Sequence, residues 1–364
     1  MTYDIGFLGG GQLARMSIQA AQRMGLSCLS LDPGSDTPAS QVADAVEGRL
    51  DDPESIAKVI SASRRVTLEN EFIPASAIRE AFALAGRELH DLVPGVDTLE
   101  IIQDKFRQRE RYLAHGAPSP LAVGMEDAVA RIGFPMVLKA RFGGYDGKGT
   151  RYARSEEELE SHRGLWGGGG WMAEQFVPFR RELAVMVARS RHQTVCFPTM
   201  ETIQTNHVCD LVFPSGVDAR DAAIAAVEAV DGFGLFGVEL FELEGGDFQI
   251  NEIAPRPHNT GHYSLDWGGI SQFEMHVRLV MGLHLPEPAG QPTCMANVLG
   301  RESSINWRRG LDACLEAEPE AHFHWYGKAE MKPGRKMGHI NAVGHDCRAV
   351  AERARSAFFQ ALEA

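Results

Sequence analysis

Cysteine is scarce in this chain of 364 residues, and its six copies show no paired spacing. They lie too far apart for a C-x-x-C pair or for the disulfide frame of a small secreted domain, so we expect reduced thiols, no zinc site and a cytoplasmic location. Long apolar runs are also missing. No segment approaches the length that spans a bilayer, and no basic stretch precedes the first apolar run at residues 3–8, so we expect a soluble protein without a membrane partner.

Basic residues are also fewer than acidic ones. The chain has 36 lysines and arginines against 49 acidic residues, which gives a formal net charge of −13 and a pI near 5.5. A nucleic-acid partner is not expected, because binding to a phosphate backbone needs a surplus of cations. The basic residues should instead act locally on small anions. The length exceeds what one hydrophobic core usually serves, so two or three domains are predicted.

The chain opens with a predicted strand, a glycine loop and a helix. Residues 3–8 are apolar, Gly9-Gly10-Gly11 follows, and residues 12–24 have the spacing of an amphipathic helix. Gly9-x-Gly11-x-x-Ala14, with Asp32 at the end of the next strand, is a weak match to the dinucleotide-binding fingerprint. The glycines could cradle a phosphate, or they could only permit a tight turn and close helix packing. Both alternatives predict an α/β domain with a parallel sheet.

The next segment places two acids at a strand end. A helix is predicted from Pro53 to about residue 63, followed by a strand at 65–68 that ends in Glu69-Asn70-Glu71. Ligands bind at the carboxyl ends of parallel strands, although glutamates on a loop are more often only solvated. After a helix at 74–86, the spacing predicts one continuous helix from residue 97 to about residue 115 that contains Lys105. Lys105 alone could be surface charge.

A new unit is predicted beyond the stiff link at residues 117–120, because its two prolines stop a helix. A strand at 136–140 carries Lys139 among apolar neighbours, where a lysine needs an anionic partner. Residues 143–150 read GGYDGKGT, with four glycines in eight positions. That density lets backbone amides close over phosphates and suits a lid. The loop is not a Walker loop, because GxxxxGK[ST] is absent.

The centre of the chain is predicted to be rich in strands. They are expected at 171–177, 182–188, 194–200 and 208–213, with a helix at 218–230 packed on them. The segment Glu174-Gln175-Phe176-Val177 resembles a strand whose backbone groups and single acid bind an adenine base and its ribose.

Residues 237–262 organise the rest of the chain. Their alternating apolar residues and the turn Gly245-Gly246-Asp247 predict a hairpin that brings Glu239 opposite Asn251 and Glu252. Such an all-oxygen set suits Mg²⁺ with substrate phosphates, and the alternative is a solvated strand pair. The polar run from 255 to 262 leaves the hairpin and is typical of a ligand-binding loop.

The last segment, from about residue 291, is predicted to be small. Strands are expected at 294–299, 322–326 and 339–343, and a terminal helix at 347–362. The run at 326–339, YGKAEMKPGRKMGH, is basic in an otherwise acidic chain. A local cluster of cations suits a phosphate, although a solvated turn is the plain alternative.

These motifs, in this order, resemble the ATP-grasp superfamily. The sequences GGGQL, GGYDGKG, INEIAPRPHNTGH and WYGKAEMKPGRKMGH narrow the resemblance to the 5-(carboxyamino)imidazole ribonucleotide synthases of purine biosynthesis, nearly end to end. The resemblance implies an α/β fold, α+β in its centre. Its expected units are an N-terminal doubly wound parallel-sheet domain at 1–100, an ATP-grasp domain at 101–290 with a lid lobe at about 118–178, and a small β-rich domain at 291–364.

The resemblance also implies a reaction. That family uses ATP and bicarbonate to carboxylate the exocyclic amine of aminoimidazole ribonucleotide through carboxyphosphate, with Mg²⁺ as a cofactor, and a homodimer is implied. The ATP contacts it implies are Lys105, Lys139, Gly144, Tyr145, Asp146, Gly147, Lys148, Gly149, Thr150, Glu174, Gln175, Phe176, Val177, Glu182, Gln204, Asn251 and Glu252. The metal ligands it implies are Glu239 and Glu252.

The same resemblance implies the residues that handle the acceptor. Those that would bind the ribonucleotide are Gly11, Gln12, Leu13, Glu71, Tyr145, Lys328, Arg335 and Lys336. Those that would take part in the chemistry are Asp146, Arg256, His258, Asn259 and Lys328. Asp146 could accept the amine proton as a general base.

Two departures and three rival interpretations remain at this point. Many relatives have a histidine where Gln204 stands, and some have an arginine at Lys105. The first rival is an NAD-dependent oxidoreductase, which leaves the loop at 143–150 and the hairpin acids unexplained. The second is the formate-using glycinamide ribonucleotide transformylase, which shares the architecture. The third is a nucleotide-binding regulator without catalytic activity.

Overall fold

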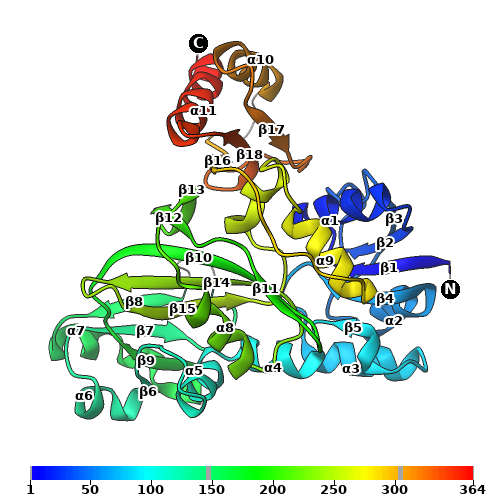
Figure 1. The fold of residues 1–364 in the computed structure, drawn as a ribbon. Helices are drawn as coiled ribbons and strands as arrows, with labels where there is room; N and C mark the ends of the chain where they lie inside the picture. The colour runs from blue at the N-terminus through cyan, green and yellow to red at the C-terminus, as the bar shows by residue number, and fades with distance from the viewer. Residues whose placement is uncertain (1, 145–148, 302–305, 364) are drawn as a thin grey trace.

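The first domain is a parallel sheet covered on both faces. In this computed structural model, which describes residues 2–144, 149–301 and 306–363, its strand order is β3-β2-β1-β4-β5 (Figure 1). This confirms the predicted parallel N-terminal sheet. Its elements are β1 (Tyr3–Leu8), α1 (Gln12–Arg23), β2 (Cys28–Asp32), β3 (Asp44–Glu47), α2 (Pro53–Ala62), β4 (Ser63–Leu68), α3 (Ala75–Leu84), the 3-10 helix η1 (Leu89–Asp91), β5 (Leu92–Val93) and α4 (Val96–Gln103).

Strand alternation divides the core of this domain between its two faces. Leu8, Leu29 and Leu31 pack against α2 and α3 on one face. Ile5 and Phe7 point to the other face, where α1 is joined by α9 (Gln272–Met281) from a distant part of the chain. Helix α9 therefore ties the first domain to the centre of the molecule.

The second unit is a small antiparallel lobe that we call the lid lobe. Its strand order is β6-β9-β7-β8, and apolar side chains from all four strands form its core. Helix α5 (Lys105–Ala114) leads into it. Its elements are β6 (Ala122–Gly124), η2 (Met125–Asp127), α6 (Ala128–Arg131), β7 (Met136–Ala140), β8 (Thr150–Ala153), α7 (Glu156–Ser161), η3 (Arg163–Leu165), η4 (Gly167–Gly169) and β9 (Trp171–Gln175).

The largest sheet is antiparallel and runs from the centre into the C-terminal segment. Its main order is β15-β14-β10-β12-β13-β16-β18-β17, and β11 pairs with β10. Its elements are β10 (Phe179–Arg189), β11 (Thr194–Cys196), β12 (Met200–Thr205), β13 (Val208–Pro214), α8 (Arg220–Ala229), β14 (Gly234–Leu243), β15 (Phe248–Ala254), η5 (Asn259–Leu265), β16 (Thr293–Leu299), α10 (Trp307–Ala317), β17 (His322–Trp325), β18 (Lys336–Val343) and α11 (Cys347–Glu363).

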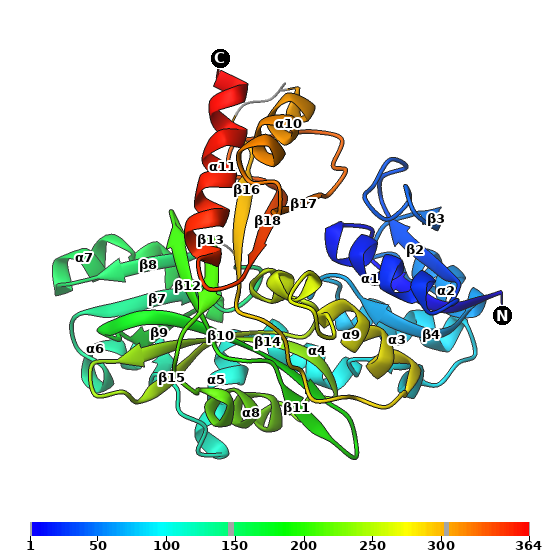
Figure 2. The ribbon, with the colours of Figure 1, turned by 45° about the horizontal axis from the view of Figure 1, so that its top comes forward.

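The C-terminal segment shares this sheet. Strand β16 pairs with β13 through Leu211–Ala296 and Val212–Met295, while α11 packs along β16 and β18 (Figure 2). A segment too small to bury much surface by itself is thereby stabilised by its neighbour.

One predicted helix is wrong in its extent. The expected continuous helix from residue 97 to about residue 115 is two helices, α4 and α5, which break at Asp104. The Asp104 carboxylate accepts hydrogen bonds from the N–H groups of Phe106 and Arg107, which caps α5, and it also binds Arg141 of the lid lobe. The break places Lys105 at the first turn of α5. Helix α10 was not predicted.

All six cysteines are buried and free, which confirms the prediction of unpaired thiols. Nowhere in the described ranges does a helix combine the length and the apolar character that crossing a membrane requires.

Candidate active site

One cleft collects most of the predicted site residues. It has a volume of about 520 Å³ and takes its lining from the parallel sheet, the lid lobe and the large antiparallel sheet. Such a volume is typical of small-molecule sites. The predicted residues that line it are Gln12, Leu13, Glu71, Lys105, Lys139, Gly144, Thr150, Glu174, Gln175, Phe176, Val177, Glu182, Gln204, Glu239, Asn251, Glu252, Arg256, His258, Asn259 and Lys336.

The paired strands β14 and β15 hold the acidic centre of this cleft. Glu239 lies directly opposite Glu252, which confirms the predicted hairpin. In a regular strand, Asn251 and Glu252 would point to opposite faces. The register shifts by one residue between the pairs Glu239–Glu252 and Leu240–Ile250, and this bulge lets Asn251 and Glu252 both line the cleft. The alternation of the sequence did not predict the bulge.

The two carboxylates differ in their ionisation. Burial and the nearby charges of Glu252 and Glu182 raise the pKa of Glu239. Burial also disfavours the charged form of Glu252, but the Lys105 ammonium, 2.9 Å from its Oε1, together with the charges of Lys139 and Arg256 outweighs that effect and lowers its pKa. A divalent cation would stabilise such a pair of acids. Among the described residues, no group of three or more His, Cys, Asp or Glu side chains has the arrangement of a metal site.

Lys139 reaches the cleft from a buried ion-pair network. Its Nζ lies 2.7 Å from one oxygen of Glu174, and Nε of Arg109 lies 2.7 Å from the other. The side chains of Arg109 and Glu174 are only 5% and 3% exposed. Burial opposes ionisation of Glu174, but the two cations prevail and lower its pKa to about 2. Both carboxylate oxygens are therefore held by protein cations, and Glu174 serves to orient Lys139.

Arg109 was not predicted as a site residue. Besides Glu174 on β9, its guanidinium donates to the carbonyls of Ile250 and Asn251 on β15, at 3.0 and 2.7 Å. It thus ties the lid lobe to the acidic hairpin. Sequence reasoning had no signal for it, because Arg109 stands among the charged residues of α5 and its partners lie 65 to 142 residues away.

The wall beside β9 is apolar. Val137, Phe176 and Val177 line the cleft there, and Phe176 is 38% exposed. Such side chains form a slot that suits a flat base. Farther along, Gln204 makes a side-chain hydrogen bond with Glu182, whose pKa is raised by burial. The glutamine that departs from the family pattern therefore has a partner inside the cleft.

The first glycine loop meets the cleft at Glu69, which the resemblance did not assign. The N–H of Leu13 donates to Glu69 Oε1 at 3.3 Å. A Cβ on Gly11 would lie 2.3 Å from the same oxygen, so a larger residue there would displace the Glu69 carboxylate. Burial raises the pKa of Glu69 to about 7, against the opposing charges of Arg256 and Lys328. A carboxyl that titrates near neutrality can exchange protons with a bound ligand.

Arg256 and Glu71 form an ion pair next to the acidic centre. Nη2 of Arg256 lies 2.7 Å from Oε1 of Glu71, Nε contacts the other oxygen, and both side chains are 15% exposed. Burial and the charges of Arg256 and Lys336 lower the pKa of His258 well below its usual value, so its ring is neutral at pH 7. Its Nε2 lies 4.0 Å from Glu239. His258, which the resemblance assigns to the chemistry, therefore adjoins the expected metal ligands.

Two amide side chains fix the loop that carries His258 and Asn259. Gln272, at the start of α9, accepts from the His258 N–H at 2.9 Å and donates to the His258 carbonyl at 2.8 Å, and its Nε2 also lies 2.8 Å from His262 Nδ1. Asn259 exchanges two hydrogen bonds with Asn297 of β16, at 3.1 and 2.6 Å. Sequence reasoning missed Gln272 and Asn297. The available signal was a polar residue, Gln272, on the buried face of α9.

The basic C-terminal run lies against the first domain. Tyr326 is buried beside α1, and the charge of Lys328 acts on the carboxyl at the first glycine loop. Lys336 lines the cleft. Arg335 is exposed, donates to the Glu330 carbonyl at 2.7 Å and does not line the cleft.

Part of the predicted lid lies outside the described residues. Gly144 and Thr150 line the cleft, whereas Gly149 does not, and the first loop contributes Gln12 and Leu13 but not Gly11. The predicted residues that lie outside the described ones are Tyr145, Asp146, Gly147 and Lys148.

The acid of the dinucleotide match has a structural role. Asp32 accepts hydrogen bonds from the backbone N–H groups of Gly10 and Gly34, both at 3.0 Å. It therefore shapes the glycine loop instead of offering its carboxylate to a ribose, which removes the main support for an oxidoreductase.

Comparison with known families matches the chain in three parts. Residues 1–103 match the ribonucleotide synthetase preATP-grasp domain, residues 119–273 the ATP-grasp domain, and residues 293–353 the phosphoribosylaminoimidazole carboxylase C-terminal domain.

Individual relatives agree with these matches. The chain is 40% identical over 353 residues to N5-carboxyaminoimidazole ribonucleotide synthase of Synechococcus elongatus, covering 92% of this chain and 88% of that protein. It is similar to an ADP complex of N5-carboxyaminoimidazole ribonucleotide synthetase, with a TM-score of 0.88, 32% identity, and coverage of 100% and 98%. It is also similar to the Aspergillus clavatus synthase in complex with ADP and 5-aminoimidazole ribonucleotide, with a TM-score of 0.87, 28% identity, and coverage of 100% and 99%.

The order of the motifs, the joint cleft of three units and these similarities lead to one assignment. The chain belongs to the N5-carboxyaminoimidazole ribonucleotide synthase family, the ATP-grasp ligases that carboxylate aminoimidazole ribonucleotide in purine biosynthesis.

Proposed function

We propose that this one cleft performs both halves of the family's reaction, the phosphorylation of bicarbonate by ATP and the carboxylation of the ribonucleotide amine. The observation that carries the proposal is the closeness of two charge sets. His258 Nε2 lies 4.0 Å from Glu239 of the acidic centre, and His258 shares its loop with Arg256, which is paired with Glu71. The proposed phosphate-and-metal site and the proposed anion site would therefore share one wall.

Mg²⁺ would be held by Glu239 and Glu252, with Asn251 beside them. The fit rests on two opposed carboxylates, one of which resists ionisation, and on their all-oxygen chemistry. When bound, the ion would neutralise charge that develops on the transferring phosphoryl group.

The ATP phosphates would lie near Lys105 and Lys139 and under the loop at 144–150. The base would enter the slot of Val137, Phe176 and Val177. Preorganised cations of this kind stabilise charge in the transition state, because they need no reorientation during the reaction. Carboxyphosphate reacts with water, so a closing loop would protect it.

Arg256 would bind bicarbonate, held in place by Glu71. An oxygen of bicarbonate would attack the γ-phosphorus and release ADP, which forms carboxyphosphate. The ribonucleotide amine would then attack the carboxyl carbon, and the bond to the phosphate oxygen would break to give the carbamate and inorganic phosphate. Asp146 would accept the proton that the amine loses, while the neutral His258 and Asn259 would position the carboxyl group.

The body of the ribonucleotide would lie against the loop at 11–13 and the basic C-terminal run. Lys328, Arg335 and Lys336 would hold its 5′-phosphate, and Lys336 already lines the cleft. We also propose a homodimer, a cytoplasmic location and domains at 1–100, 101–290 and 291–364. Sedimentation velocity of the purified protein would test the dimer.

The function is tested by ADP release with each substrate omitted in turn. We expect release to require aminoimidazole ribonucleotide and bicarbonate together, and we expect formate not to replace bicarbonate. Sustained ADP release with formate and glycinamide ribonucleotide would instead identify a transformylase and overturn the proposal.

A further inference from the structure

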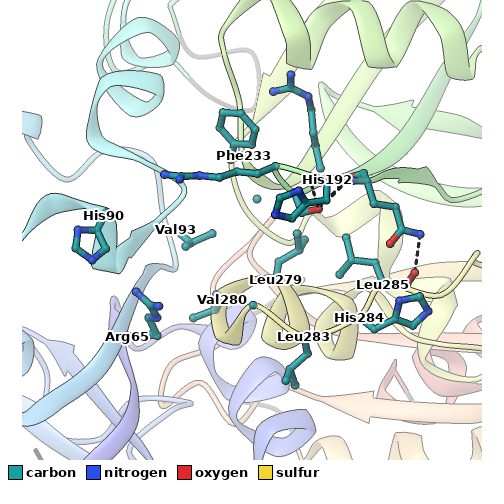
Figure 3. Close-up of a pocket in the computed structure, with 16 residues that line it drawn as sticks. Arg65, His90, Val93, His192, Phe233, Leu279, Val280, Leu283, His284 and Leu285 are labelled. Atoms are coloured by element: carbon teal, nitrogen blue, oxygen red, sulfur yellow. Dashed lines mark hydrogen bonds between the residues drawn. The ribbon is translucent and has the colours of Figure 1, made fainter.

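A second cavity has a volume of about 570 Å³ (Figure 3). It shares no lining residue with the cleft. Its wall comes from the first domain, from the hairpin between β10 and β11, from residues 233–234 and from the end of α9 with the segment that follows. Its volume falls in the range of small-molecule sites.

The cavity is basic in a chain whose net charge is −13. Among the described residues, no Asp or Glu lines it, and the six basic residues that do are Arg65, His90, Arg189, Arg191, His192 and His284. Arg65 is paired with Asp91, but Arg87 binds the same carboxylate at 2.6 Å, so one acid serves two guanidinium groups. A surplus of positive charge is left facing the cavity.

Arg189 is held by two uncharged groups. Its Nη1 donates to the Gly232 carbonyl at 2.9 Å, and its guanidinium lies 4.4 Å from the centre of the Phe233 ring. A carbonyl and a ring fix the orientation of a cation but leave its charge available to an anion.

The floor between the basic residues is apolar. Figure 3 shows Arg65 and His90 on one side and His192 on the other, with Val93 and Val280 between them. A ligand that fits this cavity therefore combines an anionic group with an apolar body.

The hairpin at the rim is already ordered. The N–H groups of His192 and Gln193 donate to the hydroxyl of Ser190 at 3.2 and 3.0 Å, and Gln193 Nε2 donates to the Leu285 carbonyl at 2.8 Å. Binding here would not have to order the loop first, which preserves affinity.

We propose that this cavity is a second binding site, for a phosphorylated nucleoside. The phosphate would contact Arg189 and Arg191, and the base would lie over the apolar floor. Guanidinium groups match phosphate oxygens in geometry as well as charge.

The test is calorimetric titration with adenosine 5′-monophosphate into protein whose cleft is saturated with ADP, Mg²⁺ and aminoimidazole ribonucleotide. We expect saturable binding at one site per chain, weakened at least tenfold when adenosine replaces the monophosphate. The double variant Arg189→Gln, Arg191→Gln should lose at least tenfold in affinity while carboxylation turnover stays unchanged. The single variant Arg191→Gln, at an exposed side chain, covers the case in which the double variant misfolds.

The matched control is Arg308→Gln, Arg309→Gln on α10, which removes the same charge at exposed positions outside the cavity. It should bind as the wild type does. The proposal is overturned if the wild type shows no saturable heat up to millimolar nucleotide, or if the cavity variants bind unchanged. It is equally overturned if those variants convert a dimer to a monomer without any nucleotide effect, because a second copy of the chain would then be the occupant. None of these outcomes bears on the carboxylation assay.

Discussion

Single residues in the cleft act mainly as charge pairs in which a cation sets the ionisation of an acid. Lys105 keeps Glu252 charged, whereas Glu239 opposite it resists ionisation. Two buried cations act on Glu174 in the same way. Glu174 has a cation on each carboxylate oxygen, whereas Glu252 pairs with Lys105 through Oε1.

Glu239→Gln tests the metal role. The substitution keeps size and fold but removes a carboxylate that would bind the ion, so we expect kcat to fall at least 100-fold, with a smaller change in KM for ATP. Steady-state kinetics with varied Mg²⁺ give the measurement. Glu244→Gln, an exposed change on the same hairpin, should behave as the wild type. Wild-type turnover in Glu239→Gln would contradict the assignment.

Arg109→Met tests the buried network. It leaves Glu174 with one of its two cations, and removing one partner of a buried ion pair typically costs about 3–5 kcal/mol. We expect a loss of that order in the free energy of unfolding, measured by urea denaturation, and a higher KM for ATP because Lys139 is no longer oriented. The double change Arg109→Met, Glu174→Gln should recover part of the loss. A double variant less stable than the single one would count against this explanation.

At the scale of elements, three local features of the strands and helices shape the site: a bulge, a helix break and a helix start. The bulge in β15 turns Asn251 and Glu252 towards the same cleft. The break at Asp104 puts Lys105 at a helix start, and the first residue of α9 holds the loop of His258. The bulge and the break each place a polar group where an uninterrupted strand or helix would not place it, and the helix start places Gln272 beside the His258 backbone.

Gln272→Leu tests the loop clamp. It removes an amide that makes two hydrogen bonds to the backbone of His258, so we expect kcat to fall and the KM for aminoimidazole ribonucleotide or bicarbonate to rise. The KM for ATP should stay close to that of the wild type, because the two hydrogen bonds hold the loop of His258 and not the residues proposed to contact ATP. Gln272→Asn, which retains an amide, should be less impaired. If the three KM values shift together, the effect is general destabilisation.

The sequence predicted the regular parts of this arrangement. The Gly245-Gly246-Asp247 turn and the alternation around it were sufficient to oppose Glu239 and Glu252. The break at Asp104 was not predictable, because an aspartate within a helical pattern shows its role only when Arg141 from the lid lobe pairs with it. Arg109 and Asn297 were not predicted as site residues for the same reason, because their partners are distant in the chain.

Across the whole molecule, buried polar side chains lie at the contacts between the structural units. His276 of α9 lies 3.0 Å from Thr67 of the parallel sheet, and the rings of His262 and His339 pack 5.0 Å apart between η5 and β18. Burial lowers the pKa of all three histidines, that of His276 to about 3. The contacts between the units therefore favour the neutral form of these imidazole rings.

These three buried histidines should make the free energy of unfolding depend on pH. Below the ordinary histidine pKa of about 6.5, the unfolded chain takes up protons that the folded chain refuses, so the free energy of unfolding falls as pH falls. Each such histidine contributes a slope of about 1.4 kcal/mol per pH unit. His276→Gln should flatten the dependence between pH 6 and pH 4.5 by about that amount, measured by urea denaturation, and the exposed control His345→Gln should not. An unchanged slope in His276→Gln would contradict this origin.

The central claim is that bicarbonate is phosphorylated and then delivered to the amine in one cleft. Its most direct test is a single turnover with ¹⁸O-labelled bicarbonate, followed by mass analysis of the inorganic phosphate. If carboxyphosphate forms, the bond that breaks lies between carbon and the bridging oxygen, so each phosphate should carry one ¹⁸O atom from bicarbonate. Phosphate free of label, formed alongside carboxylated product, would contradict the account.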